Sequence, residues 1–383
     1  MLRLKSLPEI DGRMPIFTLL VDPAGYRPCT QNMLIDVEFR DYWLEHFTTH
    51  FELTAALAAQ VYGPAAAADI AAARRDLGNE MAALRRQPDR YGELDLQMLA
   101  VVREKCLSRN HIPDPFLLAK QRENDAMLPL YPRVAAELDH YSDPAQALRV
   151  LVEGVFAGNI FDLGATATAQ SYAHESPDFF KVRASLDGRR PWLVDHLDAF
   201  SQRLLHGPAY HQALIFVDNA GSDFILGIMP LVRFLAQRGT HIYILANETP
   251  SLNDMTIAET HALLPRLAQL DPVLKELMDG GQITAATSGG GTPLLDLRHV
   301  SEQCNRVAAA ADLLIFEGMG RALESNYHAA FKVDAVKLCM IKEEIIARRH
   351  GGKVFDVLFR YDARPGAWPS NRHRNAGNHS NRL

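Results

Sequence analysis

The chain has 383 residues, of which 48% are hydrophobic and 22% charged, and its formal net charge is −6. This length and composition predict a globular protein of one large or two ordinary domains, each with its own core. The acidic balance argues against a general nucleic-acid-binding protein, which would carry a basic excess. A few local lysines and arginines can still hold a small anionic ligand.

The four cysteines are scattered without a CxxC pair, which favours a reducing compartment and argues against a structural zinc site. The apolar run from Met14 to Val21 is short and contains Pro15. We therefore expect neither a signal peptide nor a membrane span, and no membrane partner. The expected compartment is the cytoplasm, and the sequence leaves the oligomeric state open.

Hydrophobic residues recur at helical spacing through the first half of the chain. Asp-Pro pairs at 114–115 and 143–144 mark helix starts, because aspartate caps a helix and proline suits its first turn. Residues 1–206 are therefore predicted to form a mainly helical N-terminal portion. Helices are expected at 36–60, 65–86, 95–109, 114–127, after 132, at 143–155 and at 191–206.

After residue 206, short apolar runs alternate with helical patterns. This alternation predicts a Rossmann-like, doubly wound and mostly parallel sheet over residues 207–362, with helices on its faces. Residues 363–383 contain no acidic residue and little core-forming material, so a disordered tail is expected. Strands are predicted at 214–217, 242–246, 283–287, 313–316, 336–341 and 354–361, and helices at 224–237, 256–269, 299–310, 323–330 and 343–349.

Polar groups follow most of the predicted strands at their carboxyl ends. The crossover rule places these strand ends at one edge of the sheet, where open α/β proteins bind ligands. Taken singly, each group has an ordinary structural explanation, such as a helix cap or a flexible turn. Taken together they predict a functional site. Its members are Asp218, Asn219, Asp254, Ser288, Glu317, Arg321 and Lys342.

The chemistry of this set indicates a metal and a phosphate. The two aspartates and the amide are hard oxygen donors of the kind that Mg²⁺ or Mn²⁺ prefers. Backbone N–H groups at Gly289–Gly291 can cradle phosphate oxygens, and Arg321 and Lys342 can add positive charge. Hydrolysis by a metal-activated water is favoured over attack by Asp218, because no Asp-X-Asp pair follows this strand.

The chain resembles the metal-dependent damage-control phosphatases from about Tyr26 to Tyr361. The closest form is the subfamily of stand-alone plant-type enzymes and of the C-terminal phosphatase domain of pantothenate kinase 4. The motifs occur in the same order throughout. They include Ala-Gly-Asn-Ile-Phe-Asp-Leu-Gly at 157–164, Val-Asp-Asn-Ala-Gly-Ser-Asp at 217–223, Asn-Asp at 253–254, Glu-Gly-Met-Gly-Arg at 317–321, Asp-Tyr-Trp at 41–43, and Asp-Pro-Phe at 114–116 with Lys120 and Glu-Asn at 123–124.

The resemblance implies a Rossmann-like domain with a helical N-terminal portion, and a divalent metal held by Asp218, Asn219 and Asp254. Mg²⁺, Mn²⁺, Co²⁺ or Ni²⁺ would support catalysis, with Asp218 and Asp254 as catalytic residues. The implied substrate is a small phosphorylated metabolite, 4′-phosphopantetheine or its oxidised forms, which links the chain to coenzyme A metabolism. Candidate substrate and phosphate contacts are Asn159, Asp162, Ser288, Glu317, Arg321, Asn326 and Lys342.

Two positions depart from the family pattern. Leu163 stands where an aromatic residue is expected, and Asp223 lies where other members vary. Leu163 bears on the shape of the pocket and so on the substrate, not on the reaction. The residues alone would make 158–164 a loop between helices. The resemblance implies instead that this loop closes the pocket over the strand ends and joins the two halves into one catalytic unit.

Two alternatives from other classes remain open. One is a carboxyl methyltransferase that uses S-adenosylmethionine, with a nucleoside at the glycine-rich strand ends. The other is a non-catalytic sensor that binds a phosphorylated metabolite. The three oxygen ligands argue against both, because neither function needs them.

Overall fold

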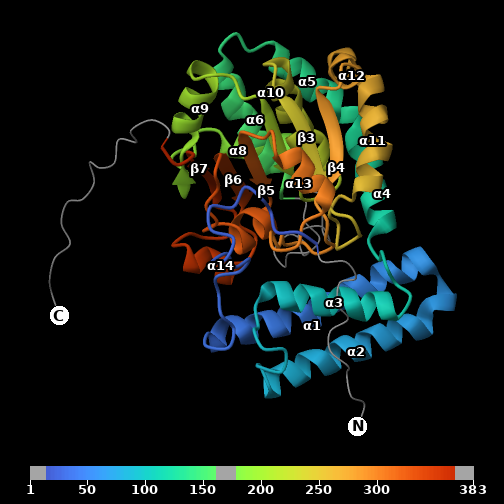
Figure 1. The fold of residues 1–383 in the computed structure, drawn as a ribbon. Helices are drawn as coiled ribbons and strands as arrows, with labels where there is room; N and C mark the ends of the chain where they lie inside the picture. Colours follow the sequence, from blue (N-terminus) through green and yellow to red (C-terminus); the bar gives the residue numbers. More distant parts are fainter. Residues whose placement is uncertain (1–13, 161–177, 367–383) are drawn as a thin grey trace.

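The computed structural model describes residues 14–160 and 178–366. It contains a seven-stranded sheet with helices on both faces, and a layer of three helices beyond one end of the strands (Figure 1). The predicted class, a helical N-terminal portion with a Rossmann-like, mostly parallel sheet, is confirmed. The strands are β1 Val194–Asp195, β2 Gln212–Phe216, β3 His241–Ala246, β4 Ile283–Thr287, β5 Leu313–Glu317, β6 Asp334–Met340 and β7 Val357–Asp362.

The strands lie in the order β1-β7-β6-β5-β2-β3-β4. The core of the sheet from β6 to β4 is parallel, but β7 runs antiparallel to β6. The expectation that every carboxyl end lies at one edge is therefore wrong for β7. The chain reverses through α14 (Glu344–Arg349), and the hydrogen bonds from Ile341 N–H to Asp356 O and from Phe355 N–H to Ile341 O extend the antiparallel pairing beyond the two strands.

Most predicted helices are present, and aspartate side chains at positions 36, 95 and 143 cap three of them. The helix expected at 191–206 begins only at Leu197, because the main chain at Leu193 and His196 donates to β7. Helices α8 and α12 were not predicted. The α-helices are α1 Val37–Tyr62, α2 Ala67–Arg86, α3 Leu96–Arg109, α4 Leu117–Met127, α5 Tyr131–Asp139, α6 Pro144–Gly158, α8 Phe179–Leu186, α9 Leu197–His206, α10 Met229–Gln237, α11 Ile257–Leu270, α12 Pro272–Asp279, α13 Glu302–Ala308 and α14 Glu344–Arg349.

Two short π-helices follow the strands that carry the predicted site. η3 spans Asp223–Ile228 after β2, and η4 spans Met319–Ser325 after β5. The helix expected at 323–330 is therefore misplaced, since the chain coils directly after the strand. Such π turns are rare and occur frequently at functional sites.

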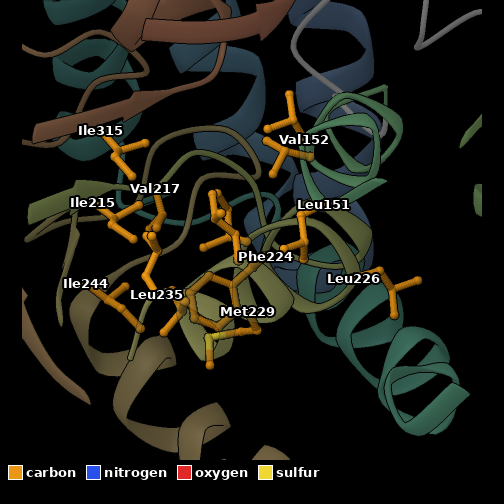
Figure 2. Packing of buried hydrophobic residues seen from close by; sticks show 14 of the residues in the cluster. Leu151, Val152, Ile215, Val217, Phe224, Leu226, Met229, Leu235, Ile244 and Ile315 are labelled. Atoms are coloured by element: carbon orange, nitrogen blue, oxygen red, sulfur yellow. The ribbon is translucent and has the colours of Figure 1, made fainter. Parts of the chain in front are cut away.

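Alternation along the strands produces a hydrophobic core on each face of the sheet. Ile215 and Val217 of the β2 region pack against α6, η3 and α10 on one face (Figure 2). Leu214 and Phe216 face the other side, where α13 and the segment around Phe17 cover the sheet. A third cluster joins α1–α3, called the helical layer below, to η4, β6 and α14. The division of the chain at residue 206 stays a prediction, and β1 lies before that point.

Helix α6 brings Asn159 to the sheet because its last residue is glycine. A Cβ added at Gly158 would lie 2.8 Å from Asp223 Cα and 2.8 Å from Ser222 O. The helix end therefore packs directly against the backbone at the start of η3. This close approach sets the depth at which Asn159 enters the site.

We expect Gly158→Ala to lower the free energy of unfolding by about 1–3 kcal/mol, because backbone atoms on both sides cannot yield to the added methyl group. Gly78→Ala is the matched control. Gly78 lies inside α2 with nothing within 4 Å of the added Cβ, so the substitution should raise the free energy of unfolding by about 0.5–1 kcal/mol. Thermal and urea denaturation measure both. Equal stability of the two variants would contradict the packing argument.

Candidate metal and phosphate site

The predicted site lies where the order of the sheet reverses. β2 pairs with β3 on one side and with β5 on the other, because the chain runs from β2 through β3 to β4 and then crosses back to β5. Asp218 follows β2 and Glu317 ends β5. Open α/β sheets bind ligands at this switch point, beyond the carboxyl ends of the strands.

Backbone hydrogen bonds place the second aspartate beside the first. Met255 N–H donates to Asp218 O at 2.8 Å, and Ala220 N–H donates to Asn253 O at 2.9 Å. This short antiparallel pairing brings the loop after β3 against the loop after β2, and Asn219 and Asp254 become bridge partners. The three predicted metal ligands are therefore held together by main chain as well as by side chains.

Four buried carboxylates gather here: Asp218, Asp223, Asp254 and Glu317, called the acidic cluster below. Three of them, Asp218, Asp223 and Glu317, can bring one oxygen each within 4.8 Å of one another. Asp254 faces Asp218 across the Arg321 guanidinium, which donates to Asp218 and, at 2.9 Å, to Asp254 Oδ2. The side-chain amides of Asn159 and Asn219 donate hydrogen bonds to these carboxylates.

Asn159 and Asn219 act as amide bridges inside the cluster. Asn159 Nδ2 donates to Asp223 Oδ2 and to Glu317 Oε1, both at 2.9 Å. Asn219 Nδ2 donates to Asp218 Oδ2 at 2.9 Å and to Asp223 Oδ2 at 3.0 Å. Lys342 Nζ donates to Asn159 O at 2.8 Å. The structure thus brings together Asn159, Asp218, Asn219, Asp254, Glu317, Arg321 and Lys342.

Burial makes the charged forms of these acids costly. Burial raises the pKa of Asp218 to about 8, although the Arg321 guanidinium lowers it. Burial, reinforced by Asp223 and Asp218, also raises the pKa of Glu317 well above its usual range. For Arg321, burial lowers the pKa, but Asp254 and Asp218 more than reverse this and raise it.

The donor set fits a divalent cation. The four carboxylates of the cluster meet two cationic side chains, Arg321 and Lys342, so two negative charges are left over when all are ionised. Asp223 Oδ1 is buried and has no hydrogen-bond partner among the residues that the structure describes. Buried acceptors are normally paired, so an unpaired carboxylate oxygen in an acidic site suits a metal ligand.

Glycine at position 318 is a steric requirement of this arrangement. Gly318 has φ 93°, and a Cβ there would lie 2.2 Å from Asp218 Oδ2. In the same motif, a Cβ at Gly320 would lie 2.2 Å from Pro293 O. The Gly-Met-Gly-Arg motif therefore lets the chain after β5 pass close to Asp218 and deliver Arg321.

Two candidates have their polar groups paired with other parts of the protein. Ser288 Oγ donates to Ala246 O at 3.0 Å and to Gly289 O at 3.1 Å. Asn326 accepts from the Tyr26 hydroxyl at 2.8 Å and donates to main-chain oxygens of Leu295 and Arg321. These contacts account for the burial of both side chains without a ligand. Asp162 and Leu163 lie outside the described residues.

The glycine run contacts a neighbouring loop. Gly290 O accepts from the N–H groups of Glu248 and Thr249, and a Cβ at Gly291 would lie 1.8 Å from Thr249 Oγ1. The run therefore supports the loop that leads to Asp254. A phosphate cradle at Gly289–Gly291 stays a prediction. The contacts with the loop explain the glycine at position 291 by packing alone, without a bound phosphate.

The structure adds residues that sequence reasoning did not assign. Asp223 shares the amides of Asn159 and Asn219. Asn247 Nδ2 donates to Asp254 Oδ2 at 3.1 Å, and its Oδ1 accepts from Arg321. The sequence spacing could have indicated Asp223, because it lies four residues after Asn219, with the turn at Gly221 between them. Asn247 directly follows β3, as Asp218 follows the β2 region.

Helix α4 holds both loops that carry the predicted metal ligands. Asn124 Oδ1 accepts from the N–H of Gly221, two residues after Asn219, at 2.8 Å. Lys120 Nζ, fully buried, lies 2.7 Å from Glu259 Oε1 and 3.0 Å from Asp114 Oδ2. Glu259 in turn closes a capping box with Thr256, two residues beyond Asp254. Asn124 and Lys120 are positioning residues, since they fix the loops without joining the acidic cluster.

A cavity joins the helical layer to the acidic cluster. On the sheet side it is lined by Asp218, Asn219 and Asp254, with Gly320 and Met319 beside them. On the opposite side it is lined by the α1 and α3 residues Trp43, His46, Phe47, Leu96 and Arg103. A ligand that reaches the acids therefore also meets the helical layer.

The structure is a doubly wound α/β sheet with buried acids and amides at its switch point, the place where α/β proteins of this class bind their ligands. The chain belongs to the damage-control phosphatase family: residues 49–358 match the damage-control phosphatase ARMT1-like domain. This confirms the family that the motifs predicted. Among the described residues, none of the helices has the length and apolar character needed to cross a membrane.

Several curated proteins are similar to this chain. A 4′-phosphopantetheine phosphatase of Mus musculus is 32% identical over 90% of this chain and 48% of its own length. Pantothenate kinase 2 of Arabidopsis thaliana is 37% identical over 91% of this chain and 42% of its own length. The chain thus spans less than half the length of these relatives. A damage-control phosphatase of Arabidopsis thaliana is 36% identical over 73% of this chain and 76% of its own length.

A solved structure shares the fold. The crystal structure of a DUF89 family protein from Pyrococcus horikoshii superposes with a TM-score of 0.56 at 16% identity. The match covers 82% of this chain and 96% of that chain. At this identity the likeness concerns the fold alone.

We expect Asn124→Ala to weaken Mn²⁺ binding by about 10–100-fold, because loss of a group that orients ligands typically has this effect. The variant removes the acceptor for Gly221 N–H and frees the turn that follows Asn219. Asn124→Asp, which keeps an acceptor at the same place, should retain most of the affinity. Calorimetric titration with Mn²⁺ measures both. Unchanged affinity in Asn124→Ala would contradict the positioning role.

Proposed function

We propose that the chain is a divalent-metal-dependent phosphatase that hydrolyses 4′-phosphopantetheine or an oxidised form of it. The observation that carries this proposal is the acidic cluster at the switch point. When its four carboxylates are ionised they exceed the two cationic side chains by two charges, which a divalent cation would neutralise, and its amides and cationic side chains contact the same acids. The family and the phosphatase relatives support the reaction class, and one relative's name supports the substrate.

Asp218, Asn219 and Asp254 are the proposed metal ligands. When bound, the metal would supply positive charge to the phosphoryl oxygens and lower the pKa of a water, so that hydroxide is available at neutral pH. Mg²⁺, Mn²⁺, Co²⁺ and Ni²⁺ all suit oxygen and amide ligands, and we propose that one of them is used. Asp223 and Glu317 form the neighbouring half of the cluster.

The protein's own cationic and amide groups are proposed to hold the phosphate. The Arg321 guanidinium is fixed by Asp218, Asp254 and Asn247, so its charge is already oriented before a phosphate arrives. Lys342 and Asn159 lie on the other side of the acids. Asp218 would orient the attacking water and accept the proton that the water loses, and the same proton would then pass to the alcohol oxygen as its bond to phosphorus breaks. Direct attack by Asp218 is the second mechanistic candidate.

We expect Asp254→Asn to lower phosphate release by more than about 100-fold, because loss of a ligand exceeds the effect of losing a group that only orients one. Release of inorganic phosphate from 4′-phosphopantetheine is measured with each of the four metals. Asp279→Asn, exposed on α12 and paired with Lys275, is the matched control and should keep full activity. Full activity in Asp254→Asn, with a folded circular-dichroism spectrum, would refute the site assignment.

Direct metal titration separates the two halves of the acidic cluster. If Asp218, Asn219 and Asp254 hold the ion, Asp254→Asn should weaken Mn²⁺ binding at least tenfold more than Glu317→Gln. The paramagnetic resonance signal of free Mn²⁺ measures both affinities. The reverse order would instead assign the ion to Asp218, Asp223 and Glu317, the three acids that lie within 4.8 Å of one another.

The two alternatives are distinguished by the same assays. Methyl transfer from S-adenosylmethionine that persists with a chelator would favour the methyltransferase. Tight binding of 4′-phosphopantetheine without turnover, across all four metals, would favour the sensor. We also propose a reducing compartment such as the cytoplasm, since all four cysteines are free and three are buried.

A further inference from the structure

We propose that Trp43 of α1 recognises the alcohol part of the substrate by donating its indole N–H to an acceptor near the phosphate ester. The inference rests on the proposed phosphatase function and deepens it. It assigns a specificity-determining residue to the helical layer, which supplies none of the acidic cluster.

The indole N–H of Trp43 is buried and unsatisfied. The residue is 5% exposed, and Nε1 has no hydrogen-bond partner among the residues that the structure describes. Trp43 lines the cavity that also reaches Asp218, Asn219 and Asp254. A buried donor without a partner costs free energy, and a ligand acceptor in this cavity would remove that cost.

The ring is held in place by its neighbours. Edge-on aromatic contacts join Trp43 to Tyr42 at 5.5 Å and to His46 at 5.0 Å between ring centroids. The Tyr42 hydroxyl donates to Glu343, and His46 Nδ1 lies 3.8 Å from the same carboxylate. Glu343 directly follows Lys342 in the sequence. The wall formed by α1 is therefore tied to the strand end that carries Lys342.

An unpaired indole N–H is not by itself a sign of a ligand. Trp192 Nε1 is also buried without a partner, and Trp192 packs against Phe156 and Phe359. Trp192 does not line the cavity of the acidic cluster. The combination of an unpaired donor with a place in the same cavity as the proposed metal ligands distinguishes Trp43.

The lining indicates the chemistry of the group that Trp43 faces. Phe47, Leu96, Leu252 and Leu294 contribute apolar surface beside the indole, and His46 and Arg103 contribute polar groups to the same wall. Such a wall fits a phosphate ester whose alcohol carries a branched alkyl group followed by a hydroxyl or carbonyl oxygen. The pantoyl part of 4′-phosphopantetheine has this order, with a dimethyl carbon beside the phosphorylated carbon and then a hydroxyl and an amide.

The test compares two substrates in two variants. Trp43→Phe keeps an aromatic ring and removes the donor. We expect kcat/KM for 4′-phosphopantetheine to fall about tenfold, mainly through KM, because one hydrogen bond is lost. For phenyl phosphate, which has no acceptor beyond the ester, kcat/KM should change less than about twofold. Trp192→Phe removes the other unpaired indole and should leave both substrates unchanged.

The ratio of the two kcat/KM values does not depend on the folded fraction, so partial unfolding cannot imitate the effect. Equal losses for both substrates, or no loss for either, would overturn the role of Trp43. If the wild-type chain releases phosphate from neither substrate with any of the four metals, the proposed function fails separately. Calorimetric binding of 4′-phosphopantetheine then decides: tenfold weaker binding to Trp43→Phe supports the inference, and equal or undetectable binding overturns it.

Discussion

The pairing of four buried carboxylates with amide and cationic side chains is the interaction on which the rest of the structure depends. Four carboxylates lie buried at the switch point of the sheet, and taking a carboxylate out of water is costly unless it is paired. Two amides and two cationic side chains meet part of that cost. The pKa values of Asp218 and Glu317 are raised because the rest of the free-energy cost of burying their charged forms is not compensated. A divalent cation would remove it, so the same charges that disfavour folding favour metal binding.

The rest of the fold fixes the distances within this cluster. Gly158 allows α6 to reach the backbone of Asp223, and Gly318 allows the chain after β5 to pass Asp218. On the far side, α4 holds the Gly221 turn through Asn124 and the loop after Asp254 through Lys120. These contacts act on main chain, so they set the spacing of the acids whatever ion or ligand is present. Rigid spacing of this kind lets a site bind a cation without first reorganising.

Most of the fold and part of the site could be predicted from the sequence. Strand and helix periodicity located the sheet, and the crossover rule correctly brought Asp218, Asp254, Glu317 and Arg321 to one edge. Periodicity does not report which way a polar side chain points, so it could not show that Ser288 and Asn326 bond inward to main chain. It also missed Asp223, because the π turn after β2 brings that residue back beside Asp218.

The helical layer and the strand ends are proposed to contact different parts of the substrate. In the proposed function, the acids, amides and cations act on the metal and on the phosphate, which every phosphate ester shares, and most of them come from segments that follow parallel strands. The alcohol differs from one ester to another, and the wall that we propose faces it includes residues of α1 and α3. These helices pack on the rest through their own hydrophobic cluster. A side chain on this wall can therefore change without altering the balance of charge beneath it, so substrate choice and phosphate chemistry can be varied separately.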